Sequence, residues 1–134
     1  ARAVLESTGF AIRDVLTVME ENKVSADELR IAGNPAKSDI WNQIKADITG
    51  KNILVPSAYD SELVGDLCVA LKGLGEYKSL PEAALQLVRI KKSFTPDLGS
   101  KALYDDLFGI YREIYQKLKP VFSDLSGIPD KENE

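Results

Sequence analysis

The sequence predicts an α/β fold, because helical and strand patterns alternate along its 134 residues. Two short apolar runs, at residues 29–32 and 53–55, have the length and composition of strands. Segments with apolar residues at spacings of three and four precede, separate and follow these runs. Strands separated by helices are typical of right-handed parallel crossovers, so we expect the two strands to run parallel in one sheet.

The first expected helix covers residues 1–22, and the strand at 29–32 follows it. Gly9 lies inside this helix, where a glycine costs about 1 kcal/mol relative to alanine. We therefore expect close packing against a neighbouring element at Gly9. Residues 25–28 have the spacing of a capping box but leave room for only one helical turn.

The second expected helix covers residues 39–49 and ends at Gly50, a typical C-cap residue. Trp41 shares the apolar face of this helix, so we expect its indole to lie in the core. The strand at 53–55 is apolar throughout, as in strands that are buried on both faces of a sheet.

Three further helices are expected in the second half of the chain. The first covers residues 61–74, and the next begins at the capping box of residues 79–82. The last is a long C-terminal amphipathic helix over residues 101–119, which Pro120 is expected to end. Residues 127–134 are polar and are predicted to form a flexible tail.

Only two strands are evident, and two strands make a poor independent sheet. Ile90 is placed at the end of the fourth helix, and residues 94–97 are interpreted as a turn. We therefore expect the chain to be part of a larger domain. Its incomplete sheet would expose an edge, which favours a homodimer.

Composition and charge exclude several classes of function. The net charge is −4 and no basic stripe alternates with aromatic residues, so no nucleic-acid partner is expected. No apolar run approaches the roughly 20 residues of a membrane helix, so no membrane partner is expected. No signal peptide is visible, although the chain begins at Ala1 rather than methionine, so upstream residues are expected.

Cysteine and histidine usage restricts the chemistry further. Cys68 is the only cysteine, which excludes an internal disulfide and fits a cytoplasmic protein with this residue in the core. The chain contains no histidine, which excludes Ser-His-Asp and Cys-His catalysis and the usual zinc sites. We assign no catalytic residue and no metal ligand within the chain.

The segment around residues 29–41 is the most informative for function. A strand, a turn of small residues and a helix that begins at Ser38 follow one another. Backbone N–H groups of such a turn and the dipole of the following helix favour a bound phosphate. Taken alone, the pattern is more typical of a plain connection between a strand and a helix.

The ordered motifs of the chain resemble the C-terminal portion of the FGGY family of carbohydrate kinases, most closely its xylulokinase branch. The N-terminal ARAVLES resembles the family's ARAxLEG, and GNPAKS followed by Trp41 resembles GGGAKSxxW. QIKAD with Gly50 resembles QxxADxxG, and the YREIY of the last helix resembles YRxxY. Val55-Pro56, followed by Val64-Gly65, resembles the family's P…LGAA segment.

The resemblance implies an actin-like ATPase fold of the ribonuclease-H-like type, with residues 1–126 forming the C-terminal part of the second kinase domain. It implies ATP and Mg²⁺ as cofactors and transfer of the γ-phosphate to a hydroxyl of a ketopentose, such as xylulose, or a related polyol. In the family, the sugar and the catalytic Asp lie mainly in the upstream domain, so this chain alone should be inactive. The residues implied to contact the nucleotide are Gly33, Asn34, Pro35, Ala36 and Ser38.

Three departures from the family pattern support an alternative. Asn34 and Pro35 replace glycines, and Asp66 replaces a small residue after Gly65. The alternative is a divergent, catalytically silent module that binds a nucleotide or a partner protein. Two further interpretations stay open. Asp47 and Asp60 either cap helices and face solvent or have a metal-binding or catalytic role, and Trp41 either packs in the core or stacks on adenine.

Overall fold

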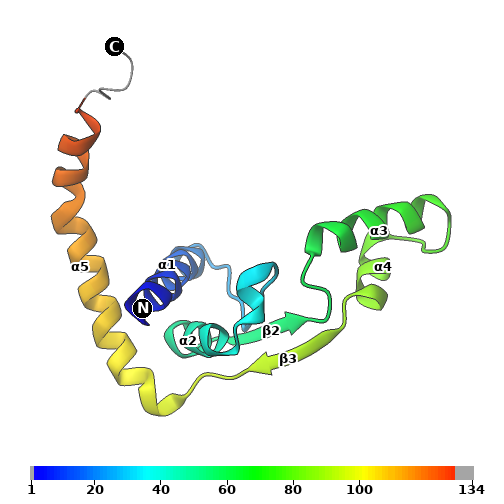
Figure 1. Ribbon diagram of the computed structural model, residues 1–134, viewed down its shortest axis with the longest axis horizontal. Coiled ribbons are helices and arrows are strands. Elements are labelled where there is room, and N and C mark those ends of the chain that lie inside the picture. Colours follow the sequence, from blue (N-terminus) through cyan, green and yellow to red (C-terminus); the bar gives the residue numbers. More distant parts are fainter. Residues whose placement is uncertain (1, 129–134) are drawn as a thin grey trace. The chain divides into compact units, whose positions relative to one another are not determined.

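The computed structural model describes residues 2–128, and the chain forms two compact units, Ala1–Lys101 and Ala102–Glu134. The first unit contains a sheet with helices around it, and the second is built on the long helix α5 (Lys101–Ser126) (Figure 1). Of the predicted polar tail over 127–134, residues 129–134 lie outside the described part of the chain. None of the helices within residues 2–128 combines the length and the apolar character needed to cross a bilayer.

The sheet has the strand order β1-β2-β3. Strand β1 (Glu28–Arg30) runs parallel to β2 (Asn52–Pro56), as the sequence predicts. Two side chains of β2, Ile53 and Val55, are fully buried, so the central strand lies in the core.

A third strand, β3 (Ile90–Phe94), corrects the prediction of two strands. It pairs antiparallel with β2, so that Ser93 lies opposite Leu54, and a register irregularity falls between Val55 and Pro56. The sequence of β3, IKKSF, is almost entirely exposed and contains two lysines. Charged, exposed residues are typical of edge strands, and they hide the apolar alternation by which strands are recognised.

Helices α1 (Arg2–Glu21) and α2 (Asp39–Thr49) pack directly against each other. Gly9 lies against Ile48, since a Cβ at Gly9 would stand 2.7 Å from Ile48 Cδ1, which confirms the expected close packing. The Trp41 indole N–H donates to Leu5 O at 3.1 Å and to Thr8 Oγ1 at 2.9 Å.

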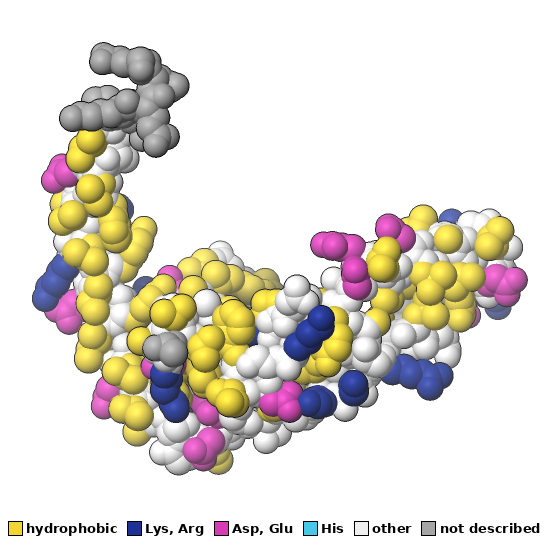
Figure 2. All heavy atoms as spheres, in the orientation of Figure 1, with side chains coloured by type: hydrophobic (Ala, Val, Ile, Leu, Met, Phe, Trp, Pro, Cys, Tyr) yellow, Lys and Arg dark blue, Asp and Glu magenta, His cyan; other side chains and the backbone are white. Residues whose placement is uncertain are grey.

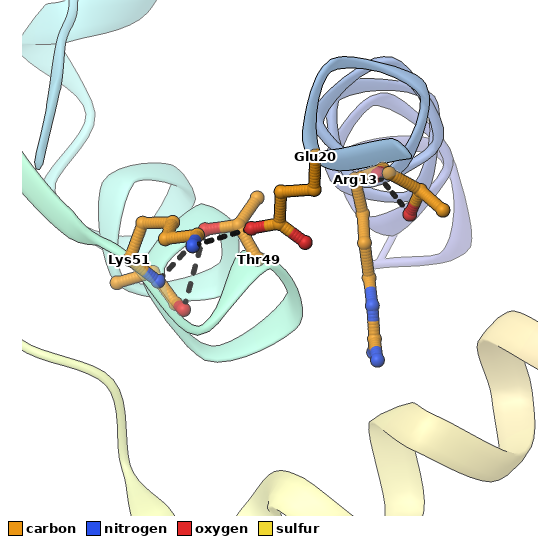
Figure 3. Close-up of polar contacts among 6 residues, drawn as sticks. Arg13, Glu20, Thr49 and Lys51 are labelled. Carbon is orange, nitrogen blue, oxygen red and sulfur yellow. Dashed lines mark hydrogen bonds and ion pairs between the residues drawn. The ribbon is translucent and has the colours of Figure 1, made fainter. Parts of the chain in front are cut away.

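A polar contact near the C-terminus of α1 adds to its packing against α2. Figure 3 shows Glu20 of α1 extending toward Lys51, which follows α2. Lys51 Nζ donates to Glu20 Oε1 at 2.7 Å, and the Lys51 backbone N–H donates to Thr49 Oγ1 at 3.3 Å (Figure 3). The C-terminus of α2 is therefore fixed against α1.

Helices α3 (Ser61–Gly73) and α4 (Leu80–Leu87) pack against each other after β2. Ser79 Oγ accepts a bond from the Glu82 N–H at 3.3 Å, as the capping box predicts. The returning bond of Glu82 Oε2 comes from the Lys78 N–H, one residue before the expected donor. Cys68 is buried in α3, in agreement with its assignment to the core.

Helix α5 corrects the prediction that Pro120 ends the last helix, because Pro120 lies inside it. Its apolar pattern continues after the proline at Val121, Phe122 and Leu125. A proline inside a helix removes one backbone bond, and the amphipathic pattern on both sides favours continuing the helix. Hydrophobic side chains gather along α5 in Figure 2.

Candidate functional site

A concavity of about 450 Å³ lies between two loops of the first unit. One loop follows β1 and contains the short helix η1 (Asn34–Lys37), and the other follows β2 and leads into α3. The lining residues come equally from the two loops: Ala32, Gly33, Asn34 and Lys37 from the first, and Tyr59, Asp60, Ser61 and Glu62 from the second. The carboxyl ends of two parallel strands therefore open into one site.

Gly33 connects the two loops. Its N–H donates to Tyr59 O at 2.7 Å. Its backbone has φ 75° and ψ −172°, a conformation that is essentially restricted to glycine. A Cβ at Gly33 would meet only Pro35 Cδ, at 3.7 Å, so the restriction comes from the backbone conformation rather than from crowding.

The five residues implied to contact the nucleotide lie in one turn, but only two of them line the concavity. Gly33 and Asn34 do so, whereas Pro35 is in the first turn of η1 and Ala36 is 2% exposed. Ser38 caps α2, and its Oγ accepts a bond from the Trp41 N–H at 3.3 Å.

The backbone donors of this turn differ from the expectation that they face a ligand. The Ala36 N–H donates to Gly33 O at 3.2 Å, and the Ser38 N–H donates to Pro35 O at 3.3 Å. The Gly33 N–H is bonded to Tyr59 O, and Pro35 has no N–H. The internal bonds of η1 therefore use donors that a glycine-rich turn would offer to a phosphate.

Lys37 supplies the positive charge of the site, and our sequence analysis did not select it. Its Nζ donates to Asn34 Oδ1 at 2.9 Å and lies 5.6 Å from the centre of the Tyr59 ring. The lysine of GNPAKS was visible in the motif, but its contact with Tyr59 joins residues 22 positions apart and needs the fold. Asn34 thus holds the Lys37 ammonium group at the lining of the concavity.

The N-terminus of α3 forms the opposite wall. Asp60 Oδ1 accepts a bond from the Leu63 N–H at 3.2 Å, so its carboxylate caps the helix, as one of the two open interpretations held. Glu62 lies in the first turn of α3. These carboxylates offset the positive end of the helix dipole, which would otherwise favour an anion. Asp66 is exposed on the same helix and is not its cap.

Two lysines that contact α2 side chains have shifted pKa values. Lys92 of β3 donates to both carboxylate oxygens of Asp39, at 2.8 Å and 2.6 Å, and this hydrogen bond raises the Lys92 pKa. Lys45 is buried in α2, with its Nζ 4.4 Å from the centre of the Trp41 ring, and burial lowers the Lys45 pKa. The first contact joins β3 to the start of α2, and the second holds the Lys45 side chain against the Trp41 ring of the same helix.

Comparison with known proteins identifies the family. Residues 1–74, just over half of the chain, match the C-terminal domain of the FGGY family of carbohydrate kinases. The chain belongs to this family. It is 27% identical over 128 residues to the xylulose kinase of Staphylococcus epidermidis, covering 96% of this chain and 26% of that protein. It is 30% identical over 115 residues to the ribulokinase of Mycolicibacterium smegmatis, covering 85% and 20%.

The fold is similar to that of a solved sugar kinase. The ligand-bound xylulose kinase of Lactobacillus acidophilus superposes with a TM-score of 0.84 at 26% identity, covering 92% of this chain and 25% of that one. The chain therefore has the fold of the C-terminal part of an actin-like sugar kinase, as the resemblance implied. It spans about a quarter of the length of these relatives.

Proposed function

We propose that this chain forms part of the nucleotide side of an ATP-dependent sugar kinase. The complete protein would transfer the γ-phosphate of ATP to a hydroxyl of a ketopentose or a related polyol. The observation that carries the proposal is the concavity of about 450 Å³ where the GNPAKS loop meets the start of α3. The xylulose and ribulose kinases among the relatives support this class of sugar.

The residues of the concavity fit a nucleotide in three respects. Gly33 presents backbone without a side chain, so a ligand has room to approach the loop. Lys37 brings a positive charge, and the Asn34 amide and the Ser61 hydroxyl add polar groups to the lining. Phosphoryl transfer depends mainly on positioning and charge stabilisation, which such groups provide.

The concavity offers Mg²⁺ two carboxylates, Asp60, which caps α3, and Glu62, in the first turn of that helix. Among residues 2–128, no group of three Asp, Glu, Cys or His side chains is arranged to hold a metal ion. Mg²⁺ in kinases is commonly held by substrate phosphates with one or two carboxylates, and it neutralises the charge of the phosphates when bound. We propose that the catalytic base and any further protein ligand of Mg²⁺ lie upstream of this chain.

A second candidate function is a kinase-like module that binds a nucleotide or a partner protein without turnover. It is favoured by the bond between Asn34 Oδ1 and Lys37 Nζ at 2.9 Å, which occupies the one lysine of the lining. The inward bonds of the Ala36 and Ser38 N–H groups favour it as well.

The two candidates are separated by assaying the complete protein that carries this chain. The kinase proposal predicts ATP-dependent phosphorylation of at least one member of a panel of pentoses, ketopentoses and polyols. The silent-module alternative predicts binding of ATP with Mg²⁺ in a calorimetric titration but no sugar phosphate from any member. If the complete protein neither phosphorylates a sugar nor binds ATP, the kinase proposal and the nucleotide-binding form of the alternative both fail.

A further inference from the structure

Asn42 of α2 is a buried polar residue that reaches out of its helix into the GNPAKS loop. Its side chain is fully buried, and its Nδ2 donates to Ala36 O at 2.8 Å. Ala36 lies in the middle of η1 and is itself 2% exposed. This bond therefore joins the interior of α2 to the centre of the loop, on the side away from solvent.

Hydrogen bonds hold the loop at its start, at its middle and at its end. At its start, the Gly33 N–H donates to Tyr59 O at 2.7 Å. At its end, Ser38 Oγ accepts from the Trp41 N–H at 3.3 Å. Between these two ends, the bond from Asn42 holds the buried side of the loop, and Lys37 contacts the Tyr59 ring.

The Asn42 amide bonds the loop through its nitrogen, while its oxygen makes no hydrogen bond with the described residues. Within the described part of the chain, Asn42 Oδ1 is buried without a hydrogen-bond partner. Turning the amide over would place two acceptors, Oδ1 and Ala36 O, 2.8 Å apart, so the orientation is fixed. A buried acceptor without a partner disfavours the folded state, and an apolar residue here would remove Oδ1 but would leave the buried Ala36 O without this donor.

We propose that Asn42 is a positioning residue, which holds residues 33–38 in the geometry that contacts the nucleotide. The inference rests on the proposed function for the identity of the ligand, but not for the mechanical role of the bond. Asn42 itself does not line the concavity, so it acts on a ligand only through the loop.

The test compares Asn42→Leu with Ile48→Val in the complete protein. Leucine has the branching of asparagine; it removes the bond to Ala36 O and the orphaned Oδ1, and it leaves Ala36 O as the unpartnered buried acceptor instead. Ile48→Val shortens a buried side chain of the same helix that packs on Gly9, away from the loop. It serves as the control for a general loss of stability.

Three quantities are measured for each variant: hydrogen exchange at the Ala36 and Ser38 amides, the KM for ATP, and kcat. For Asn42→Leu, we expect severalfold faster exchange at both amides and a KM for ATP raised about three- to tenfold, with kcat within about twofold. Its urea midpoint should stay near that of the wild type. For Ile48→Val, we expect a lower urea midpoint with the KM for ATP unchanged.

The inference is overturned if the two amides exchange at the wild-type rate in Asn42→Leu, or if both variants raise the KM for ATP equally. Failure of the proposed function gives a different result. In that case the wild type itself neither binds ATP nor phosphorylates a sugar, while exchange at Ala36 and Ser38 still decides whether Asn42 holds the loop.

Discussion

Replacing Gly9 by alanine tests the packing that supports the candidate site. α2 carries the cap Ser38 and the positioning residue Asn42, and it lies on α1 where Gly9 meets Ile48. A Cβ at Gly9 would stand 2.7 Å from Ile48 Cδ1 and 3.3 Å from Ile48 Cβ. Real Cβ atoms avoid the shorter distance, so one helix or the Ile48 side chain must move.

Two opposing effects determine how much Gly9→Ala changes the free energy of unfolding. Overpacking a well-filled core costs about 1–3 kcal/mol. Alanine in place of a helical glycine returns about 1 kcal/mol of helix propensity. Because Ile48 is 1% exposed, its Cδ1 has little room to rotate away from the new methyl group, while the contact with Ile48 Cβ, at 3.3 Å, is tight but milder. We therefore expect Gly9→Ala to lower the free energy of unfolding by about 1 kcal/mol.

The assay is a double-mutant cycle with Ile48→Val, measured by urea unfolding. The valine lacks Cδ1, the atom nearest to the new methyl group. In that background Gly9→Ala should become neutral or stabilising, because the propensity gain remains, and the coupling energy should be about 1 kcal/mol. Gly65→Ala is the matched control in α3, where a Cβ meets nothing within 4 Å, and it should raise stability by up to about 1 kcal/mol.

The packing argument is refuted if Gly9→Ala stabilises the protein as much as Gly65→Ala does. It is equally refuted if the cycle shows no coupling between positions 9 and 48, since the cost would then arise elsewhere. A change in the denaturant slope m would indicate an altered unfolded state rather than a local clash.

Two further predictions concern helix termini and buried charge. Asp60→Ala removes the cap of α3 and should lower the free energy of unfolding by about 1 kcal/mol. Asp60→Asn keeps a hydrogen-bond acceptor and should lower it less. The urea midpoints of both variants check this prediction. Burial lowers the pKa of Lys45 in the folded protein. Between this pKa and that of the unfolded chain, the unfolded chain binds more protons, so the free energy of unfolding rises with pH. Lys45→Met should reduce this rise relative to the wild type in urea midpoints taken from pH 7 to pH 10, and an unchanged pH slope would contradict the shift.

Helix α2 could be predicted from the sequence in full, because local signals fix both of its ends. Ser38 accepts a bond from the Trp41 N–H, and Gly50 adopts the left-handed conformation with φ 67°. Strand β3 could not be predicted, because its exposed Lys-rich sequence lacks an apolar alternation and its identity depends on pairing with β2.

The location of the candidate site followed from the motif, but its chemistry did not. Gly33 and Asn34 line the concavity, whereas the wall contributed by Tyr59 depends on how β2 leads into α3. The role of Asn42 could not be predicted from the sequence either, because a polar residue on a helix gives no local sign that it is fully buried. Contacts between segments distant in sequence decide these features, and periodicity does not report them.

The central claim, that the GNPAKS loop contacts the nucleotide, is tested most directly by the ATP Kd of Gly33→Ala against Gly50→Ala in the complete protein. Both glycines have positive φ values, 75° and 67°, so both substitutions strain the backbone. Only Gly33 lies at the concavity, whereas Gly50 ends α2. The account predicts an ATP Kd raised about tenfold or more by Gly33→Ala and unchanged by Gly50→Ala. Equal Kd values for Gly33→Ala and the wild type, with ATP binding intact, would contradict it.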